Sequence, residues 1–269
     1  MRIGTHEFDI EKQTYIMAIL NVTPDSFSDG GKFKGVDAAL KRAEQMQHEG
    51  AAILDIGGES TRPGYTPVSE EEEMLRVLPV IEAVKARMDI PVSIDTQKAS
   101  VAEEAIHAGA DLINDIWGLK KDPLMAEVIA KHQVACCLMH NRTNTEYGNF
   151  VEELMSDLQE TLRLARKAGV ESDKIILDPG VGFAKDYAQN LEVLANLNTV
   201  KSLGYPVLLG ASRKSVIGLT LDLPSEERLE GTLATTVAAV QQGCAFVRVH
   251  DVKENFRAIQ MAQAIYRRG

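Results

Sequence analysis

The sequence has little cysteine and few aromatic residues. Its 269 residues include three cysteines and one tryptophan, and aromatic residues make up 5% of the chain. Cys136 and Cys137 are adjacent, and all three cysteines, including Cys244, lie in apolar stretches. Three cysteines cannot all pair within one chain, and adjacent ones are badly placed for an ordinary disulfide. We therefore interpret them as reduced core thiols, as in a cytoplasmic protein.

Long hydrophobic runs and an excess of basic residues are missing too. No apolar run approaches the roughly 18 residues of a membrane span. Residues 1–12 mix charged and apolar side chains, unlike the apolar core of a secretion signal. The chain carries 29 basic and 39 acidic residues, a formal net charge of −10. These features predict no membrane and no nucleic-acid partner, although they leave room for a local anion site built from a few cations.

Short β-rich runs alternate with longer helical patterns along the chain. The predicted strands are Tyr15–Leu20, Ala52–Ile56, Pro91–Asp95, Leu112–Asn114, Val134–Met139, Ile175–Asp178, Pro206–Leu209 and Phe246–Val249. The predicted helices are Val36–Glu49, Glu70–Met88, Lys98–Ala108, Pro123–His132, Val151–Ala168, Tyr187–Leu197, Ser225–Gln242 and Val252–Arg267. Repeated strand–helix units of this kind indicate a parallel sheet.

Eight strand–helix units favour a closed barrel. A TIM barrel usually takes about 250 residues, and the chain has 269. An open doubly wound sheet is the alternative, but no glycine-rich dinucleotide fingerprint follows the first predicted strand. No low-complexity linker or charge block divides the chain. We therefore predict an α/β fold made of one TIM (β/α)8 barrel domain over residues 1–269.

Two predicted loops are unusually long. Asn21–Gly35 and Gly57–Val68 follow predicted strands and exceed the usual length of about two to six residues. Both are rich in Gly, Pro, Ser, Thr and Asp, so we predict that neither contains a helix. A slack surface insertion is the alternative that this polar detail disfavours. Loops at the carboxyl ends of barrel strands carry the catalytic residues of this fold.

Polar residues stand at or just beyond the ends of the predicted strands. They are Asn21, Asp55, Asp95, Asn114, Asp178, Arg248 and His250. A strand end buried by its neighbours stays apolar unless its polarity is used. Each acid taken alone could be a helix cap or an ion-pair partner, and His250 a core histidine. Together, at one end of one barrel, they predict a shared site.

This polar set has two chemical halves. Hydrogen-bond acceptors suited to the N–H edge of a flat heterocycle come from Asp95, Asn114 and Asp178. Cations and donors suited to phosphate or pyrophosphate come from Arg62, Lys214, Arg248 and His250. The turn Gly210–Ser215 enters a predicted short helix and offers backbone N–H groups to an anion. Its glycine spacing is not that of a P-loop.

These residues lie in motifs that resemble those of the dihydropteroate synthases, a pterin-binding family of bacterial folate biosynthesis. The resemblance runs from about Tyr15 to Val252. The matching segments are Met17–Gly31 (MAILNVTPDSFSDGG), Asp55–Gly64 (DIGGESTRPG), Ser93–Thr96, Ile113–Gly118, Asp178–Phe183, Ser212–Ser215 and Arg248–His250. The first two segments are long and specific, and no motif position departs from the family pattern.

The resemblance implies an eight-stranded barrel and a transferase of a pterinylmethyl group. The reaction is the condensation of 6-hydroxymethyl-7,8-dihydropterin diphosphate with 4-aminobenzoate, giving 7,8-dihydropteroate and pyrophosphate. A dissociative route through a pterin cation, Mg²⁺ as cofactor, and competition by sulfonamides are further implications. A homodimer is also implied. No apolar stripe in the sequence identifies its interface, and our candidates are the helices near the carboxyl terminus, Ser225–Gln242 and Val252–Arg267.

The resemblance also assigns roles to individual residues. The pterin-binding set is Asp95, Asn114, Met139, Asp178 and Lys214. The diphosphate-binding set is Asn21, Arg62, Arg248 and His250, and Asn21 also reaches the metal. The 4-aminobenzoate-binding set is Phe27, Thr61, Arg62, Pro63, Phe183 and Ser215. The catalytic set is Asp29, Asp95, Asp178 and Lys214, with Asp29 on the first long loop.

Three other functions compete with this one. A pterin-dependent methyltransferase acting on a corrinoid protein would share the pterin acids, but it has no need of Arg62, Arg248 and His250 together. A Schiff-base aldolase using Lys214 needs a lysine of lowered pKa, which the anions expected nearby disfavour. A non-catalytic pterin-binding paralogue is disfavoured by the intact polar set.

Overall fold

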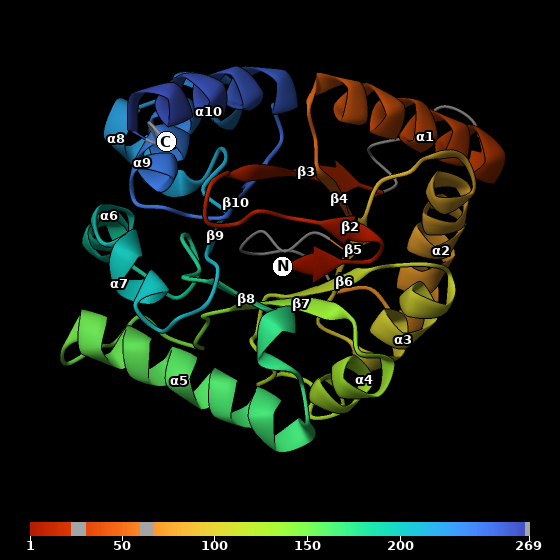
Figure 1. Cartoon of the computed structure of the whole chain (residues 1–269), viewed down its shortest axis with the longest axis horizontal. Helices are drawn as coiled ribbons and strands as arrows, with labels where there is room; N and C mark the ends of the chain where they lie inside the picture. The colour runs from red at the N-terminus through yellow and green to blue at the C-terminus, as the bar shows by residue number, and fades with distance from the viewer. Residues whose placement is uncertain (23–30, 60–66, 267–269) are drawn as a thin grey trace.

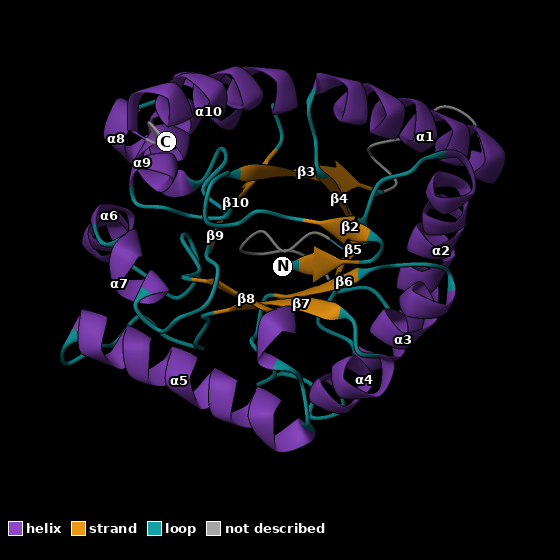
Figure 2. Cartoon of the chain, viewed as in Figure 1, coloured by secondary structure: helices purple, strands orange, loops and turns teal. Residues whose placement is uncertain are grey.

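Eight parallel strands form the centre of the molecule, and helices surround them (Figure 1, Figure 2). The computed structural model describes residues 1–22, 31–59 and 67–266, and only the backbone of residues 31–34. The strands are β3 (Tyr15–Asn21), β4 (Ile53–Gly57), β5 (Val92–Asp95), β6 (Leu112–Asp115), β7 (Ala135–Met139), β8 (Ile175–Asp178), β9 (Leu208–Leu209) and β10 (Phe246–Val249). All eight predicted strands are confirmed.

The strand order closes the sheet into a barrel. Neighbours follow the order β8-β7-β6-β5-β4-β3-β10-β9. An isolated parallel bridge between Leu177 in β8 and Val207, just before β9, joins the two ends of this series. Each strand of the barrel is parallel to its neighbours, as strand–helix repetition requires. The predicted TIM (β/α)8 barrel is therefore confirmed.

The helices of the outer ring follow the predicted series. They are α1 (Gly31–Glu49), α2 (Glu70–Arg87), α3 (Ala99–His107), α4 (Met125–His132), α5 (Phe150–Ala168), α6 (Tyr187–Ala195), α7 (Leu197–Lys201), α8 (Ser215–Leu221), α9 (Leu229–Gln241) and α10 (Val252–Tyr266). Two 3-10 helices, η2 (Ser172–Lys174) and η3 (Ser225–Glu227), complete the described elements.

Most helix boundaries lie within two residues of the prediction, and three helices differ from it in ways that matter. Helix α1 begins at Gly31, so the expectation of a helix-free loop over Asn21–Gly35 is wrong at its carboxyl end. The predicted helix Tyr187–Leu197 is interrupted at Asn196, whose backbone leaves the helical region at φ −128° and ψ 36°. The predicted helix Ser225–Gln242 starts as η3, and α9 begins only at Leu229.

The amino end of the barrel is closed by a hairpin that the sequence patterns did not predict. Strands β1 (Arg2–Ile3) and β2 (His6–Glu7) pair antiparallel, and Figure 1 shows the N-terminus over the centre of the barrel. Ile3 is 1% exposed and Phe8 is 6% exposed. The Phe8 ring packs edge-on against Tyr15 and Phe246, with centroids 4.9 and 5.7 Å away. The barrel is therefore filled and closed at this end.

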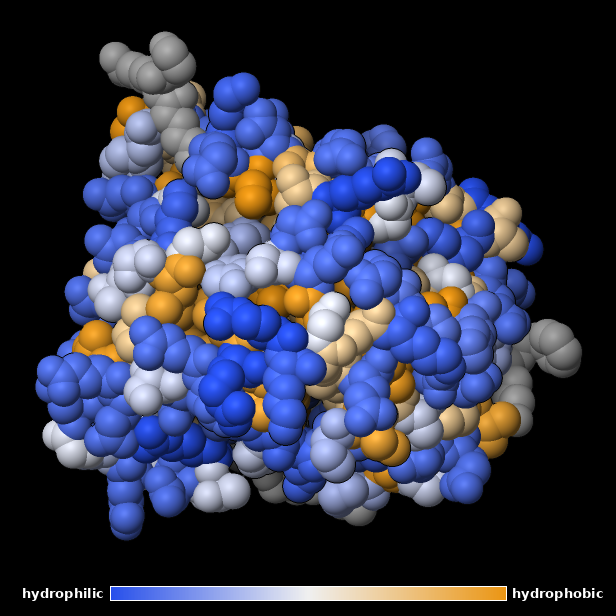
Figure 3. Space-filling view, turned by 60° about the horizontal axis from the view of Figure 1, so that its bottom comes forward, coloured by the Kyte–Doolittle hydropathy of each residue, from blue (hydrophilic) through white to orange (hydrophobic). Residues whose placement is uncertain are grey.

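Cys136, Cys137 and Cys244 are free and buried, which confirms their interpretation as core thiols. None of the helices among the described residues is long and apolar enough to span a membrane. The face drawn in Figure 3 is mostly hydrophilic, with hydrophobic residues scattered across it. Such a surface agrees with the strong acidic balance of the sequence.

Truncation of the hairpin's main anchor, Phe8→Ala, should lower the free energy of unfolding by about 3–5 kcal/mol, because it removes a buried ring that Tyr15 and Phe246 cannot fully replace. Urea denaturation followed by circular dichroism measures the change. Leu75→Ala, at a leucine that is 55% exposed, is the control and should change stability by less than about 1 kcal/mol. A loss equal to that of the control would mean that the hairpin lies outside the cooperative core.

Candidate active site

The polar strand ends predicted from the sequence meet at the carboxyl end of the barrel. Asn21 on β3 and Asp95 on β5 lie in register through the same residue of β4. Asp95 pairs with Asn114 on β6, and Met139 on β7 pairs with Asp178 on β8. Parallel strands carry their carboxyl ends to one side of a sheet, so these side chains surround one opening. We call this opening the mouth of the barrel.

Arg248 on β10 links two acids across the barrel interior. Its Nε donates to Oδ2 of Asp55 at 2.6 Å, and one terminal nitrogen donates to Oδ2 of Asp95 at 2.6 Å. Asp55 is fully buried, and Ser93 Oγ and the Asn114 amide also donate to it. Two carboxylates thus share one guanidinium, which supplies charge-assisted hydrogen bonds to both.

This network assigns Asp55 a role that the sequence did not. Asp55 appeared there only as one polar strand end, whereas the structure makes it the inner anchor of Arg248. The pKa of Arg248 is raised: burial works against its charge, but the charges of Asp55 and Asp95 outweigh burial. Arg248 therefore remains a cation and stays fixed at the base of the mouth.

Asp95 has an unused hydrogen-bond acceptor at the mouth of the barrel. Its Oδ1 is buried and accepts no hydrogen bond from the described residues. The pKa of Asp95 is raised to about 7, chiefly because burial disfavours the charged form, and Arg248 opposes the shift. A buried acceptor without a donor costs about 1–3 kcal/mol, a cost that an N–H group of a ligand would remove.

Asp178 is held by the loop that follows its own strand. Its Oδ1 accepts from the backbone N–H of Gly180 at 2.7 Å. A Cβ at Gly210, after β9, would stand 3.3 Å from Oδ2, so glycine leaves space beside this oxygen. Burial raises the pKa of Asp178, while the Gly180 N–H and the charge of Lys214 lower it. The carboxylate is thus oriented and flanked by a cation.

Lys214 and Phe183 come together beside Asp178. Lys214 is the residue before α8, and its Nζ lies 3.9 Å from the centre of the Phe183 ring. A cation over an aromatic face is attracted by the ring quadrupole. The chain passes close to the lysine at Gly182, where φ is +81° and a Cβ would meet Lys214 Cδ at 3.0 Å. The structure thus joins residues from the predicted pterin and 4-aminobenzoate sets.

The turn after β9 places Ser212 beside His250, which follows β10. His250 Nδ1 and Ser212 Oγ are 3.0 Å apart, and Ser215 is exposed as the first residue of α8. The guanidinium of Arg213 pairs instead with Asp251. Of the two adjacent cations, Lys214 faces Phe183 and Asp178. Arg213 instead binds the acid that precedes α10.

Five predicted site residues lie outside the described residues: Phe27, Asp29, Thr61, Arg62 and Pro63. The structure nevertheless describes the residues on either side of 60–66, at the base of the second long loop. Glu59 accepts from the Val68 N–H at 2.8 Å, and so ties residues on either side of 60–66. Its other oxygen accepts from Gln97 and Lys98. The sequence patterns missed Glu59, although it stands within the motif Asp55–Gly64.

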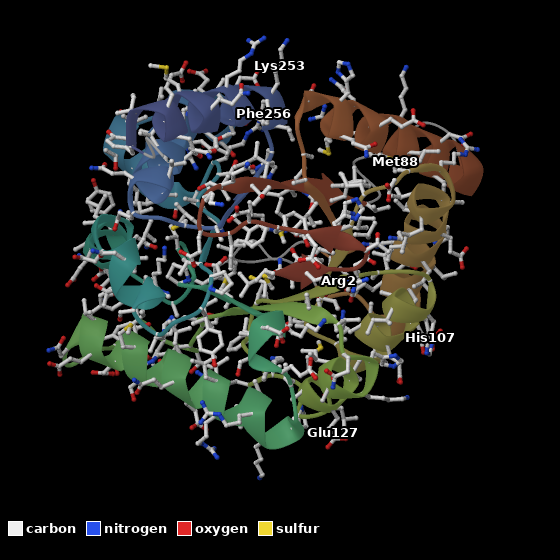
Figure 4. The ribbon with its side chains drawn as sticks, viewed as in Figure 1. Arg2, Met88, His107, Glu127, Lys253 and Phe256 are labelled. Atoms are coloured by element: carbon white, nitrogen blue, oxygen red, sulfur yellow. The ribbon has the colours of Figure 1, made fainter. Side chains whose placement is uncertain are left out.

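One group of possible metal ligands occurs among the described residues, and it does not suit Mg²⁺. Glu103, His107 and His132 place ligand atoms within 4.8 Å of one another on α3 and α4, and Figure 4 shows His107 on the outer side of the helix ring. Imidazole nitrogens suit transition metals, whereas Mg²⁺ prefers oxygen ligands. Lys131 already donates to Glu103 at 2.6 Å. We therefore interpret the group as a surface ion-pair cluster.

Comparison with known proteins identifies the family to which this barrel belongs. The sequence matches the family described as pterin binding enzyme over residues 17–250. The chain therefore belongs to the family of pterin-binding enzymes. Within that family its relatives are dihydropteroate synthases, and the one from Clostridium beijerinckii is 62% identical over 100% of both chains.

Solved structures agree with this placement. A dihydropteroate synthase from Clostridium difficile, described in the presence of pteroic acid, has a TM-score of 0.95 and 54% identity. The match covers 97% of this chain and 100% of that one. The Yersinia pestis enzyme, described as a sulfonamide drug complex, has a TM-score of 0.92 and 42% identity, covering 98% of both chains. The family resemblance drawn from the motifs is confirmed.

Replacement of the buried guanidinium, Arg248→Met, should destabilise the fold by about 3–5 kcal/mol at pH 8, because it leaves Asp55 and Asp95 without their cation. Without Arg248 the pKa of Asp95 rises beyond its present value of about 7. The carboxyl is then protonated at pH 5, so the loss should be smaller there than at pH 8.

Urea denaturation at both pH values tests this dependence. Arg213→Met is a matched control, since the Arg213–Asp251 pair is more exposed, at 33% and 21%. It should cost about 1 kcal/mol or less at either pH. A loss from Arg248→Met that does not change with pH would contradict the assigned network.

Proposed function

We propose that the mouth of the barrel condenses 6-hydroxymethyl-7,8-dihydropterin diphosphate with 4-aminobenzoate, giving 7,8-dihydropteroate and pyrophosphate. This is the reaction of the dihydropteroate synthases, to which the chain is similar over its full length. One observation carries the proposal. A buried carboxylate oxygen of Asp95 accepts no hydrogen bond from any described residue, at a mouth that also holds Asn114 and Asp178.

The pterin would lie against these acceptors. Its ring edge carries several N–H groups, and a carboxylate can pair with two such donors at once. Asp95 Oδ1 would take one of them, and Asp178 and Asn114 others, with Met139 lining the pocket. Binding of N–H donors favours the charged form of Asp95, so the ligand would lower a pKa that burial has raised to about 7.

The diphosphate would lie on the cationic side of the mouth. Arg248 has five N–H donors, and the bonds to Asp55 and Asp95 use two of them. His250 stands nearby on the same strand end, and Arg62, outside the described residues, would complete the set. Because two acids neutralise Arg248, its charge would attract the diphosphate only at short range.

Mg²⁺ fits the chemistry of this side. Asn21 ends β3 with an exposed side chain, and an amide oxygen is a ligand type that Mg²⁺ accepts. The charged oxygens of the diphosphate would supply the further oxygen ligands. When bound, the ion neutralises charge on the leaving diphosphate.

The chain's own residues would guide the bond change without a protein nucleophile. Departure of pyrophosphate leaves positive charge on the pterinylmethyl group, which Asp95 and Asp178 stabilise as carboxylates. The amine of 4-aminobenzoate then forms the new C–N bond and loses its proton. Phe183 and Ser215 would hold this second substrate together with Phe27, Thr61, Arg62 and Pro63, and Asp29 would add negative charge from the first loop. Lys214 would orient the pterin and balance the charge of Asp178.

The test of this function is pyrophosphate release on mixing the two substrates with Mg²⁺, together with detection of 7,8-dihydropteroate by chromatography. Release that depends on 4-aminobenzoate supports the proposal. Methyl transfer to a corrinoid protein without pyrophosphate release would favour the methyltransferase instead. Sulfonamides should compete with 4-aminobenzoate, in line with the Yersinia pestis relative described as a sulfonamide drug complex.

The Asp178→Ala variant should lose pterin binding, by a factor on the order of 100 or more, because it removes a buried charged acceptor from the ring site. Isothermal titration with the pterin diphosphate measures the loss. Asp186→Ala is the control, since Asp186 only caps α6, and it should leave the affinity within about twofold. Normal pterin binding by Asp178→Ala would show that the ring site lies elsewhere.

We also propose that the enzyme is a homodimer of the cytoplasm, where its three cysteines would remain reduced. Nine large hydrophobic residues are exposed among the described residues, and seven of them lie on α6, α8 and α10. They are Tyr187, Leu191, Leu219, Leu221, Met261, Ile265 and Tyr266. Figure 1 shows these helices on the same side of the barrel. A clustered apolar surface of this kind is typical of an interface between copies.

Introduction of charge into this surface, Leu219→Glu, should weaken self-association by a factor on the order of ten or more, because the residue is 68% exposed and would be covered in a dimer. Sedimentation equilibrium measures the constant. Leu75→Glu, on α2, serves as the matched control and should stay dimeric. If both variants behave as the wild type does, the interface lies on another surface.

A further inference from the structure

Lys185 is a buried cation for which the reaction has no evident use. The residue follows the loop after β8 and is 8% exposed. Its Nζ donates to three acceptors: His140 Nδ1 at 2.9 Å, the Gly180 carbonyl at 3.0 Å and the Phe183 carbonyl at 3.0 Å. An ammonium group has three N–H donors, so all of them are used.

We propose that Lys185 is a positioning residue, which fixes the loop 179–184 so that Asp178 and Phe183 face the substrates together. Two of its three acceptors are carbonyls of this loop, and they belong to residues on either side of the sharp turn at Gly182. The same ammonium therefore sets both ends of the turn. This inference rests on the proposed function, because the loop would carry one wall of each substrate site.

Gly180 transmits the position of Lys185 to Asp178. Its carbonyl accepts from Lys185, and its N–H donates to Asp178 Oδ1 at 2.7 Å. The residue has φ +73°, and a Cβ there would collide with the carbonyl oxygen of His140. Only glycine therefore allows this close approach to His140, and a shift of Lys185 would displace the peptide group whose neighbouring N–H holds the Asp178 carboxylate.

The opposite end of the loop is tied to the same cation. The Phe183 carbonyl accepts a hydrogen bond from Lys185. The Phe183 ring contacts Lys214, whose Nζ lies 3.9 Å from the ring centre. Asn190, on α6, accepts from Gly182 N–H at 2.6 Å and donates to the Lys185 carbonyl. The loop is therefore held by several hydrogen bonds. Those of Lys185 connect Asp178, on the pterin side, with Phe183, on the 4-aminobenzoate side.

A chain of hydrogen bonds leads from Lys185 to an acid outside the mouth. His140 is fully buried, and its Nε2 lies 2.9 Å from Asp157 Oδ2. Since Nδ1 faces an ammonium donor, the ring proton belongs on Nε2, which donates to Asp157. Burial lowers the pKa of His140 to about 4, so the ring is neutral at pH 7. Arg142 also donates to Asp157 and keeps this acid ionised.

The burial of a lysine here works against its charge. Burial lowers the pKa of Lys185 to about 7, while Asp178 and Asp157 favour its charged form and Arg142 and Lys214 oppose it. An apolar side chain could fill the same volume without this cost. The lysine is therefore explained better by the two carbonyls that it holds than by packing.

The test compares Lys185→Met with Lys120→Met. Lys120 is a matched control, because it donates to the Asp157 carbonyl nearby but does not contact the loop. Lys185→Met should raise the Kd for the pterin diphosphate and the KM for 4-aminobenzoate by roughly 10–100-fold each, because small misplacements of a site cost this much. The Kd for inorganic pyrophosphate, which needs Arg248 and His250, should change by less than about twofold. Lys120→Met should leave all three constants unchanged.

A conservative variant separates positioning from packing. Lys185→Gln retains amide N–H donors on a side chain one atom shorter, and should recover part of both affinities. If Lys185→Met does not fold, Lys185→Gln still tests the proposal by the same split between pterin and pyrophosphate. Equal loss of all three affinities, or no recovery in Lys185→Gln, would overturn the proposal.

Hydrogen exchange of the amides of residues 180–184 tests the loop without any activity. Lys185→Met should exchange at least about tenfold faster there than the wild type, with unchanged exchange in α5. If the wild type releases no pyrophosphate but this difference appears, the proposed reaction fails and the positioning role stands. An active wild type, with equal exchange and equal pterin affinity in Lys185→Met, would refute the positioning role alone.

Discussion

The ion network of Arg248 with Asp55 and Asp95 is the constraint on which the mouth of the barrel depends. It brings β4, β5 and β10 together through groups that cannot be left alone in the interior. Charges of this kind cost several kcal/mol each when they are buried without partners. Two acids and one cation leave an excess of negative charge, which suits a site that meets N–H donors. The same arrangement keeps a cation at the base of a mouth in an acidic protein.

Charged groups behind the mouth bind backbone groups of two loops at their described residues. Glu59 ties the base of the second long loop to Gln97 and Lys98. Lys185 plays the corresponding part for the loop after β8. In both places a buried side chain binds backbone groups of a loop whose other residues are predicted to touch substrate. Rigid support of this kind holds a site in its productive geometry.

Much of this could be predicted from the sequence because its cause is local. The alternation of strands and helices gives the barrel, and the polar strand ends Asn21, Asp95, Asn114 and Asp178 fall in register once the sheet closes. The pairing of Arg248 with Asp55 joins residues 193 positions apart, and no local pattern shows it. The N-terminal hairpin was missed because strands of two residues have no periodicity. The contact of Lys185 with His140 likewise appears only when β7 and β8 lie side by side.

The aromatic packing at the closed end of the barrel sets an order on folding during synthesis. Phe8 leaves the ribosome long before Phe246, the ring against which it packs. Strand β3 must also wait for β10, its neighbour on one side. Until that strand emerges, the hairpin cannot pack against a closed barrel, and Phe8 has Tyr15 but not Phe246 as a packing partner. Until β10 has been made, a nascent chain of this barrel therefore exposes apolar surface at this end, which is the kind of surface that chaperones bind.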